Sequence, residues 1–310
     1  MSCVTLDGWE PGGPPPNVWK LLRRAVTRGV PSAGDGRIAV DDSKKLKKQG
    51  LEPARAIEHL ERGVLSFAWA LAPDQALPED DGSLLCRLGC TSLPAWPWYA
   101  AGRPVPVSTT GEHIRLLGQQ LATCCGRAGV SVQGLSVSLL CERSWNEELA
   151  RTRNKADVSF EVVAGFVRRA WDRWSAEPGL VDGGARLVID RQGGRSYYAE
   201  RLSRVLPGVE VSVSVESEHA SRYVLSAPGG RVMTVTFQTE ADAVHFPVAL
   251  ASMTAKYARE LMMMRFNTYW SGRFAELKPT AGYGTDAGRW LRDVRAAGAG
   301  AEADGLVRRA

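Results

Sequence analysis

The stretch from residue 186 to residue 195 reads Arg-Leu-Val-Ile-Asp-Arg-Gln-Gly-Gly-Arg. Its start, Arg186–Ile189, is rich in aliphatic and β-branched residues, which is typical of a buried β-strand. The run ends in Asp190, so a carboxylate is expected at the carboxyl edge of a sheet, where open α/β sheets bind ligands. The glycines that follow allow backbone amides to approach an anion, and Arg195 is suited to holding a phosphate. The alternative is that Asp190 only caps the next helix.

Helical and strand patterns alternate on both sides of this stretch. Strands are expected at residues 1–8, 37–40, 132–140 and 209–215, with a hairpin formed by 223–226 and 231–236. Helices are expected at residues 18–27, 53–71, 112–127, 146–174 (in one or two pieces), 196–205, 247–270 and 286–297. This order predicts an α/β fold with a mixed sheet flanked by helices.

The pattern predicts one domain over residues 1–310. Residues 73–110 hold many prolines and an acidic patch, and we expect them to form a loop-rich insertion. Trp96, Trp98 and Tyr99 within it could stack on nucleic-acid bases, but packing of the insertion against the domain is favoured. The Ala/Gly-rich tail, residues 298–310, is expected to be frayed.

Composition sets broad limits on function. The 310 residues carry a net charge of +5 and a pI of about 8.9, which is compatible with a polyanionic partner but does not require one. No apolar run approaches the roughly 20 residues needed to cross a bilayer, and no signal peptide is evident, so a cytoplasmic protein is expected. The six cysteines are expected to be buried free thiols, because Cys86, Cys90 and the Cys124–Cys125 pair fit no standard zinc spacing.

A second stretch with chemical character runs from Ala241 to Lys256. Asp242 stands just ahead of a helix dense in small residues, which allow a helix to lie close to a sheet. Lys256 then projects from that helix about four turns further on. The alternative is an ordinary helix start, where the macrodipole favours an acid.

Four blocks along the chain form a recognisable series. They are Asp42-Ser43-Lys44-Lys45-Leu46, the strand that ends in Asp190, the stretch Asp242–Lys256 with Arg259-Glu260 behind it, and Gly282-Tyr283-Gly284-Thr285. In this order they resemble ribonuclease HII, a nuclease of the ribonuclease H fold, in a divergent bacterial branch. Asp190 falls where that family places the acid that ends its central strand.

The resemblance implies a ribonuclease H-like mixed sheet and a metal-dependent endonuclease. Such an enzyme hydrolyses RNA in RNA/DNA hybrids or at ribonucleotides embedded in a DNA duplex, and uses Mg²⁺ or Mn²⁺ held by carboxylates. Asp190 and Asp242 would be the catalytic metal ligands. Residues expected to contact the nucleic acid are Ser43, Lys44, Lys45, Arg195, Lys256 and Tyr283. Tyr283 could test for a 2′-hydroxyl, or it could simply pack its loop. Arg222 and His245 could approach the site.

One part of the family pattern is absent. The family opens with a strand that carries Asp-Glu-Ala-Gly and supplies two further acids, whereas the acidic run Leu6–Glu10 lacks this pattern. We therefore expect the natural start to lie upstream of Met1, and this chain to have weak or no activity. Two alternatives follow: a catalytically inactive nucleic-acid-binding protein, or a structural or regulatory α/β protein that kept only the fold.

Overall fold

The computed structural model describes residues 1–9, 13–90, 93, 95–175, 185–193 and 195–309. Parts of two stretches used above, Glu10 at the end of the acidic run and Gly194 in the stretch after Asp190, lie outside these residues.

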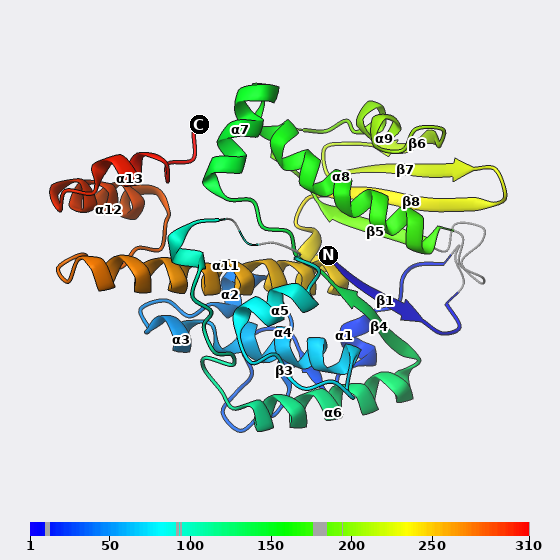
Figure 1. Cartoon of the computed structure of the whole chain (residues 1–310). Helices are drawn as coiled ribbons and strands as arrows, with labels where there is room; N and C mark the ends of the chain where they lie inside the picture. Colours follow the sequence, from blue (N-terminus) through cyan, green and yellow to red (C-terminus); the bar gives the residue numbers. More distant parts are fainter. Residues whose placement is uncertain (10–12, 91–92, 94, 176–184, 194, 310) are drawn as a thin grey trace.

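The chain is mixed α/β, as expected, with its strands in three groups (Figure 1). The strands are β1 (Ser2–Leu6), β2 (Val26–Thr27), β3 (Ile38–Ala39), β4 (Val130–Leu135), β5 (Ala185–Asp190), β6 (Glu210–Glu216), β7 (Ala220–Ala227) and β8 (Arg231–Gln238). Over the described residues, β1 pairs antiparallel with β4, β2 pairs parallel with β3, and the largest sheet has the order β5-β8-β7-β6. In that sheet β5 runs parallel to β8, while β7 is antiparallel to both of its neighbours.

The strand that ends in Asp190 forms as expected, but it does not lie in the middle of the four-stranded sheet. β5 is at one end of the strand order, so one of its edges faces away from β8. The expectation of a central strand is therefore wrong for the described sheet. The β7–β8 hairpin turns at Gly229 and Gly230, whose positive φ angles suit glycine.

Most of the expected helices are present, with shifted ends. The helices are α1 (Val18–Leu21), α2 (Ser43–Leu46), α3 (Pro53–Ala56), α4 (Glu58–Leu71), α5 (Asp81–Arg87), η1 (Pro97–Tyr99), α6 (Gly111–Ala128), α7 (Glu142–Thr152), α8 (Lys155–Trp174), α9 (Ala199–Val205), α10 (Ala241–Val244), α11 (Phe246–Arg273), α12 (Gly284–Ala296) and α13 (Gly300–Asp304). The helix expected over residues 18–27 is wrong beyond Leu21. There Val26–Thr27 pairs with Ile38–Ala39 instead, so strand pairing overrides the helical pattern.

Three hydrophobic clusters hold these elements together. The first packs α4, α6 and the amino-terminal part of α11 around β3 and β4. The second packs α8 and α9 on one face of the four-stranded sheet, which Figure 1 shows as a separate layer in the upper half of the molecule. The third joins η1, the carboxyl-terminal part of α11, α12 and α13.

The 73–110 segment is more ordered than expected, because it contains α5 and η1. Trp96 and Trp98 stack with ring centroids 4.8 Å apart, and Trp98 is buried against α11, so the packing alternative holds for this ring. A fully buried ion pair between Asp81 and Arg265 also ties the segment to α11.

The carboxyl-terminal tail was expected to be frayed, and this is wrong for part of it. α13 is a helix, and Ala299 and Ala303 are buried in the third cluster. Glu302 forms an ion pair with Arg273 of α11 at 2.5 Å, which fixes the helix further.

The six cysteines are present as thiols, but they are not all buried. Cys125 and Cys141 are buried, whereas Cys86 is exposed, so the expectation of buried thiols was only partly right. In the described parts of the chain, no helix combines the length and apolar character that crossing a membrane requires.

Candidate functional site

Asp190 and Asp242 lie together, although they are far apart in the sequence. Asp190 ends β5, and its Oδ1 accepts a hydrogen bond from the backbone amide of Ala241, with an N–O distance of 3.1 Å. Asp242 is the next residue, in the first turn of α10. Both acids line the same cleft, so the carboxyl end of β5 and the start of the α10–α11 segment form one acidic edge.

The charges at this edge act on one another. Burial raises the pKa of Asp242 above its usual range, and the nearby carboxylates of Asp42 and Asp190 raise it further, while Lys44 acts in the opposite direction. Asp42 therefore belongs to the acidic edge, although the sequence pattern singled out only the serine and lysines beside it. Burial is the main cause of the raised pKa of Asp242 and the crowding of negative charges adds to it, so a cation at this edge would relieve part of the cost.

The Asp-Ser-Lys-Lys block has a defined local structure. Asp42 caps α2, where its Oδ1 accepts a hydrogen bond from the Lys44 amide at 2.9 Å. Ser43 is buried and accepts a hydrogen bond from the Ser252 hydroxyl of α11 at 3.1 Å, so it anchors α2 to that helix. Lys44 and Lys45 are exposed, with the Lys45 ammonium 3.7 Å from Asp41. Within this block, Lys44 and Lys45 are thus the fully exposed side chains, while Asp42 is half-buried and Ser43 is buried.

Lys256 of α11 and Tyr283 come together at the surface. The Lys256 ammonium donates a hydrogen bond to the Tyr283 hydroxyl at 3.2 Å, and the Arg259 guanidinium lies 3.8 Å from the centre of the Tyr283 ring. The ring is half exposed. Gly282, beside it, has a φ of +73°, and a Cβ there would be 3.3 Å from Arg259, so glycine suits this close approach.

A buried acid links this cluster to Lys47, the residue that follows the Asp42–Leu46 block. Glu260 lies 2.8 Å from Lys47, 3.1 Å from Arg259 and 3.4 Å from Lys256. Burial alone would raise the pKa of Glu260, but the hydrogen bond and charge of Lys47, together with Arg259 and Lys256, lower it below the usual range. One carboxylate thus faces three cations, which leaves the cluster with a net positive charge.

Arg195 lies elsewhere. It is buried, and its guanidinium pairs with Asp157 of α8 at 2.5 Å and lies over the Phe160 ring. Arg201 also pairs with Asp157, at 2.7 Å. The structure therefore uses Arg195 to fasten α8 to the segment after β5, and its use as a phosphate contact stays a prediction.

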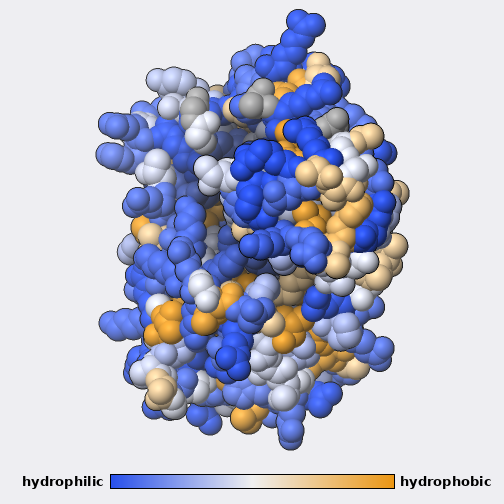
Figure 2. Space-filling view, turned by 90° about the vertical axis from the view of Figure 1, so that its left-hand side faces the viewer, coloured by the Kyte–Doolittle hydropathy of each residue, from blue (hydrophilic) through white to orange (hydrophobic). Residues whose placement is uncertain are grey.

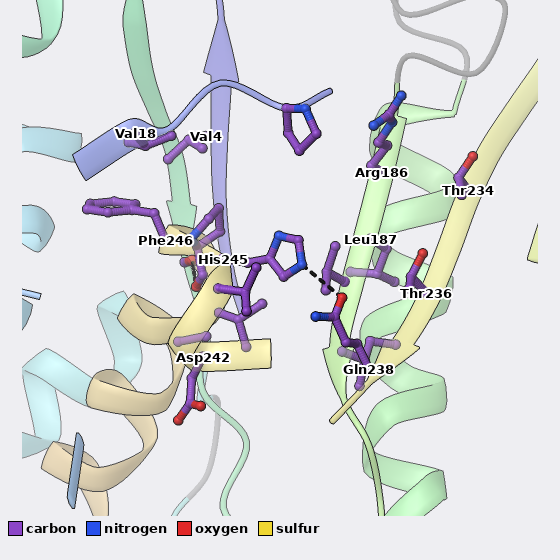
Figure 3. Close-up of a pocket in the computed structure, with 18 of the residues that line it drawn as sticks. Val4, Val18, Arg186, Leu187, Thr234, Thr236, Gln238, Asp242, His245 and Phe246 are labelled. Atoms are coloured by element: carbon purple, nitrogen blue, oxygen red, sulfur yellow. Dashed lines mark hydrogen bonds between the residues drawn. The ribbon is translucent and has the colours of Figure 1, made fainter. Parts of the chain in front are cut away.

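The acidic edge opens onto a cleft with a volume of about 1090 Å³ (Figure 3). One side is formed by β5 and the uncovered face of the sheet, where Val188, Thr236 and Arg222 lie in register on neighbouring strands. The other side is formed by β1 and the start of α11. His245 reaches across, with its Nε2 3.0 Å from the Gln238 Oε1, and burial lowers the pKa of its imidazole. Arg222 and His245, which the sequence offered only as residues that could approach the site, both line this cleft.

The acids fit a metal ion only in part. Asp190 and Asp242 present carboxylate oxygens at one edge, and oxygen ligands suit Mg²⁺ or Mn²⁺. However, no group of three histidine, cysteine, aspartate or glutamate side chains in the described part of the chain is placed to hold a metal ion. Asp42 influences Asp242 through charge without completing such a group.

Comparison with known proteins adds no assignment: no family model, no curated protein and no solved structure matches this chain.

Sequence reasoning missed two members of the site. Asp42 stands inside the quoted block and was available as a signal, since an acid ahead of Ser-Lys-Lys-Leu caps a helix at the sheet edge. Glu260 was quoted only as the end of the third block, with no role of its own. Its position one turn after Lys256 favours an i,i+4 ion pair, and this spacing could have identified it.

Proposed function

We propose that this chain is a metal-dependent endonuclease of the ribonuclease H type, which hydrolyses RNA in RNA/DNA hybrids or at embedded ribonucleotides. The observation that supports this proposal most is that Asp190 and Asp242 lie at one sheet edge, beside Lys44. Phosphate esters repel hydroxide, so hydrolysis benefits from carboxylates that hold cations next to residues that bind the phosphate backbone.

In this proposal Asp190 and Asp242 hold the divalent cation, Mg²⁺ or Mn²⁺. That ion would neutralise phosphate charge and activate water. Lys44 and Lys45 contact the backbone phosphates, and Tyr283 contacts a sugar at the half-exposed ring that Lys256 and Arg259 hold in place. Ser43 contributes through the position of α2, since its own side chain is buried.

The finer fold assignment is part of the same proposal. A parallel β5–β8 pair, extended by antiparallel β7 and β6 and covered by helices on one face, is compatible with a ribonuclease H-like sheet. The two acids that the family carries in its Asp-Glu-Ala-Gly strand have no counterpart in this sequence. Two carboxylates carry two negative charges, whereas two dications carry four positive charges. A second ion should then bind weakly, and cleavage by the 310-residue chain should be slow.

The test is cleavage of a labelled RNA/DNA hybrid in Mg²⁺ or Mn²⁺, with Asp190→Asn as the control and the same sequence as an all-DNA duplex for comparison. We expect little or no cleavage by the chain alone, and cleavage once an Asp-Glu-Ala-Gly strand is joined ahead of residue 1. Robust cleavage by the chain alone, abolished by Asp190→Asn, would show that the acids already present suffice. Failure of the extended chain to cleave would refute the nuclease.

A second candidate is a catalytically inactive protein that binds nucleic acid. It is favoured by the lack of a three-ligand metal group in the described residues, together with the exposed Lys44 and Lys45. It predicts salt-dependent binding to a hybrid with no cleavage by either version of the chain. On the face of the molecule shown in Figure 2, hydrophilic side chains dominate and hydrophobic residues lie in scattered groups.

A further inference from the structure

The helix α7 is placed unusually for an element of its length. None of its 11 residues, all of them among those that the structure describes, is buried. Helices of globular proteins are mostly stabilised by burying an apolar face, so α7 has surface left for other contacts. Residues 307–309 lie against this surface, and Figure 1 shows the end of the chain beside α7. The structure therefore shows both a binding surface and what covers it.

The hydrogen bonds between α7 and this segment involve the main chain of the segment. The Asn146 side-chain amide donates to the carbonyl of Val307 at 2.9 Å, and its Oδ1 accepts from the backbone amide of Arg309 at 2.7 Å. The Trp145 indole donates to the carbonyl of Arg309 at 3.3 Å. In an extended chain, the carbonyl of one residue and the amide two residues later face the same side, so Asn146 pairs with the segment as a neighbouring strand would.

The residue between the two paired positions is held by its side chain. The Arg308 guanidinium lies 4.5 Å from the centre of the Trp145 ring, which is within the range of a cation–π contact. The side chains of Val307 and Arg309 are exposed. The contacts therefore select an extended main chain with an arginine at its middle position, and they leave the flanking side chains unspecified.

The segment reaches α7 from the third cluster. Leu306 packs against that cluster, and a Cβ on Gly305 would be 3.6 Å from the Trp96 ring. The same ring carries the guanidinium of Arg143 of α7, 4.2 Å from its centre. Because its base is fixed in this way, the segment is presented to α7 at a high effective concentration, and a few exposed contacts suffice to hold it.

We propose that Trp145 and Asn146 of α7 form a recognition site for an extended peptide with an arginine at its centre, and that residues 307–309 of the chain itself occupy this site in the structure. Main-chain hydrogen bonds provide the affinity, and the Trp145 ring selects the arginine. A partner peptide of the same chemistry displaces the chain's own segment once it exceeds the effective concentration of that segment. The inference does not rest on the proposed nuclease activity.

Hydrogen exchange at the Arg309 amide tests the contact in the intact chain. Because Asn146 accepts from this amide, we expect exchange at least about tenfold slower than in the free peptide Gly-Leu-Val-Arg-Arg-Ala, and loss of this protection in Asn146→Ala. Glu161→Ala, at an exposed position of α8, is the control and should leave the exchange unchanged. Protection that rises with protein concentration would mean that the segment of a second copy occupies the site, and would overturn the assignment to the chain's own segment.

Full-length variants test binding of a separate peptide. Arg309→Pro removes the amide that Asn146 accepts from and should release the segment, whereas Arg309→Ala keeps that amide and is the matched control. By fluorescence anisotropy, labelled Gly-Leu-Val-Arg-Arg-Ala should bind Arg309→Pro saturably, and the parent and Arg309→Ala at least about tenfold more weakly, because their own segments compete.

Two further changes check the contacts themselves. Adding Asn146→Ala to Arg309→Pro should abolish binding, and alanine at the peptide position that corresponds to Arg308 should weaken it. Absence of binding to Arg309→Pro, or equal binding to the parent, would overturn the proposal. So would binding that does not depend on Asn146. All these readouts are independent of cleavage, so failure here leaves the proposed nuclease standing.

Discussion

Asp190 accepts a hydrogen bond from the amide of Ala241, and this interaction brings the carboxyl end of β5 against the first turn of α10. It places Asp242 beside Asp190 without any direct bond between the two carboxylates. The backbone amide of Ala241 and the His245–Gln238 hydrogen bond hold the two segments together, while the two acids repel each other.

The burial of the Asp242 carboxylate, together with this repulsion, predicts that Asp242→Asn stabilises the fold near neutral pH. The folded protein raises the pKa of Asp242, so the folded state loses stability as pH rises from the unfolded pKa of about 4 through the folded value. We expect a rise in Tm of roughly 1–3 °C at pH 7, shrinking to nothing below about pH 4, where the carboxyl is protonated in both states. Thermal unfolding from pH 3.5 to 8 measures this. The exposed Asp172→Asn is the control, and a lower Tm for Asp242→Asn at pH 7 would contradict the account.

Glu260→Gln should have the opposite effect. The folded protein lowers the pKa of Glu260, so its contribution is present above the unfolded pKa and is lost as pH falls through the folded value. Removing the charge leaves Lys47, Arg259 and Lys256 facing one another, at a cost of about 2–4 kcal/mol at pH 7. Urea unfolding should show that the difference in free energy of unfolding between the parent and Glu260→Gln is smaller at pH 3.5 than at pH 7. A difference that does not depend on pH would mean that Glu260 stabilises the fold through packing rather than through its charge.

The exposed lysines of the Asp-Ser-Lys-Lys block should contribute to nucleic-acid binding. Lys44→Ala with Lys45→Ala should weaken binding to an RNA/DNA hybrid and reduce the slope of log affinity against log salt by up to about 1.8, or about 0.9 for each phosphate that the protein no longer neutralises. A titration from about 50 to about 300 mM salt measures the slope. Lys20→Ala with Lys278→Ala removes the same charge from exposed positions outside the block. If both pairs change the slope equally, the effect is one of net charge alone.

The 73–110 segment should depend on its buried ion pair. Asp81→Ala leaves the Arg265 guanidinium buried without its carboxylate, which costs about 3–5 kcal/mol. Limited proteolysis should then cut within the segment more rapidly. Asp74→Ala, at an exposed position of the same segment, should change neither stability nor cleavage. Unchanged stability of Asp81→Ala would show that the aromatic contacts of η1 hold the segment unaided.

Local patterns predicted the elements of the fold better than their arrangement. The apolar run before Asp190 and the alternating valines Val211, Val213 and Val215 of β6 predicted strands correctly, although Val213 and Val215 are exposed, so their pattern reports strand propensity rather than burial. The ends of the helix at residues 18–27 were not visible, since Val26 takes its strand conformation from β3, which lies further along the chain. The edge position of β5 also depends on which strands pair, and no single strand encodes this.

The same division applies to the site. The sequence predicted Asp190 and Asp242 as site residues because each stands at the end or start of a secondary-structure element, where a side chain can reach a ligand. Ser43 is buried against α11, and Arg195 pairs with Asp157 of α8. The residues near positions 43 and 195 in the sequence do not predict that these helices pack there. The residue types alone thus predicted the chemistry of the site. Which of these side chains are exposed to a ligand became known only from the fold.

The helix α11 spans 28 residues, or about 42 Å, and contributes buried side chains to the first and third clusters but none to the second. We therefore expect unfolding of this helix to disrupt two of the three clusters at once, and the four-stranded sheet with α8 and α9 to unfold as a separate cooperative unit. Asp190 belongs to that unit, while Asp242 precedes α11. A ligand that holds both carboxylates would couple the two units mechanically, so that neither could open without releasing it.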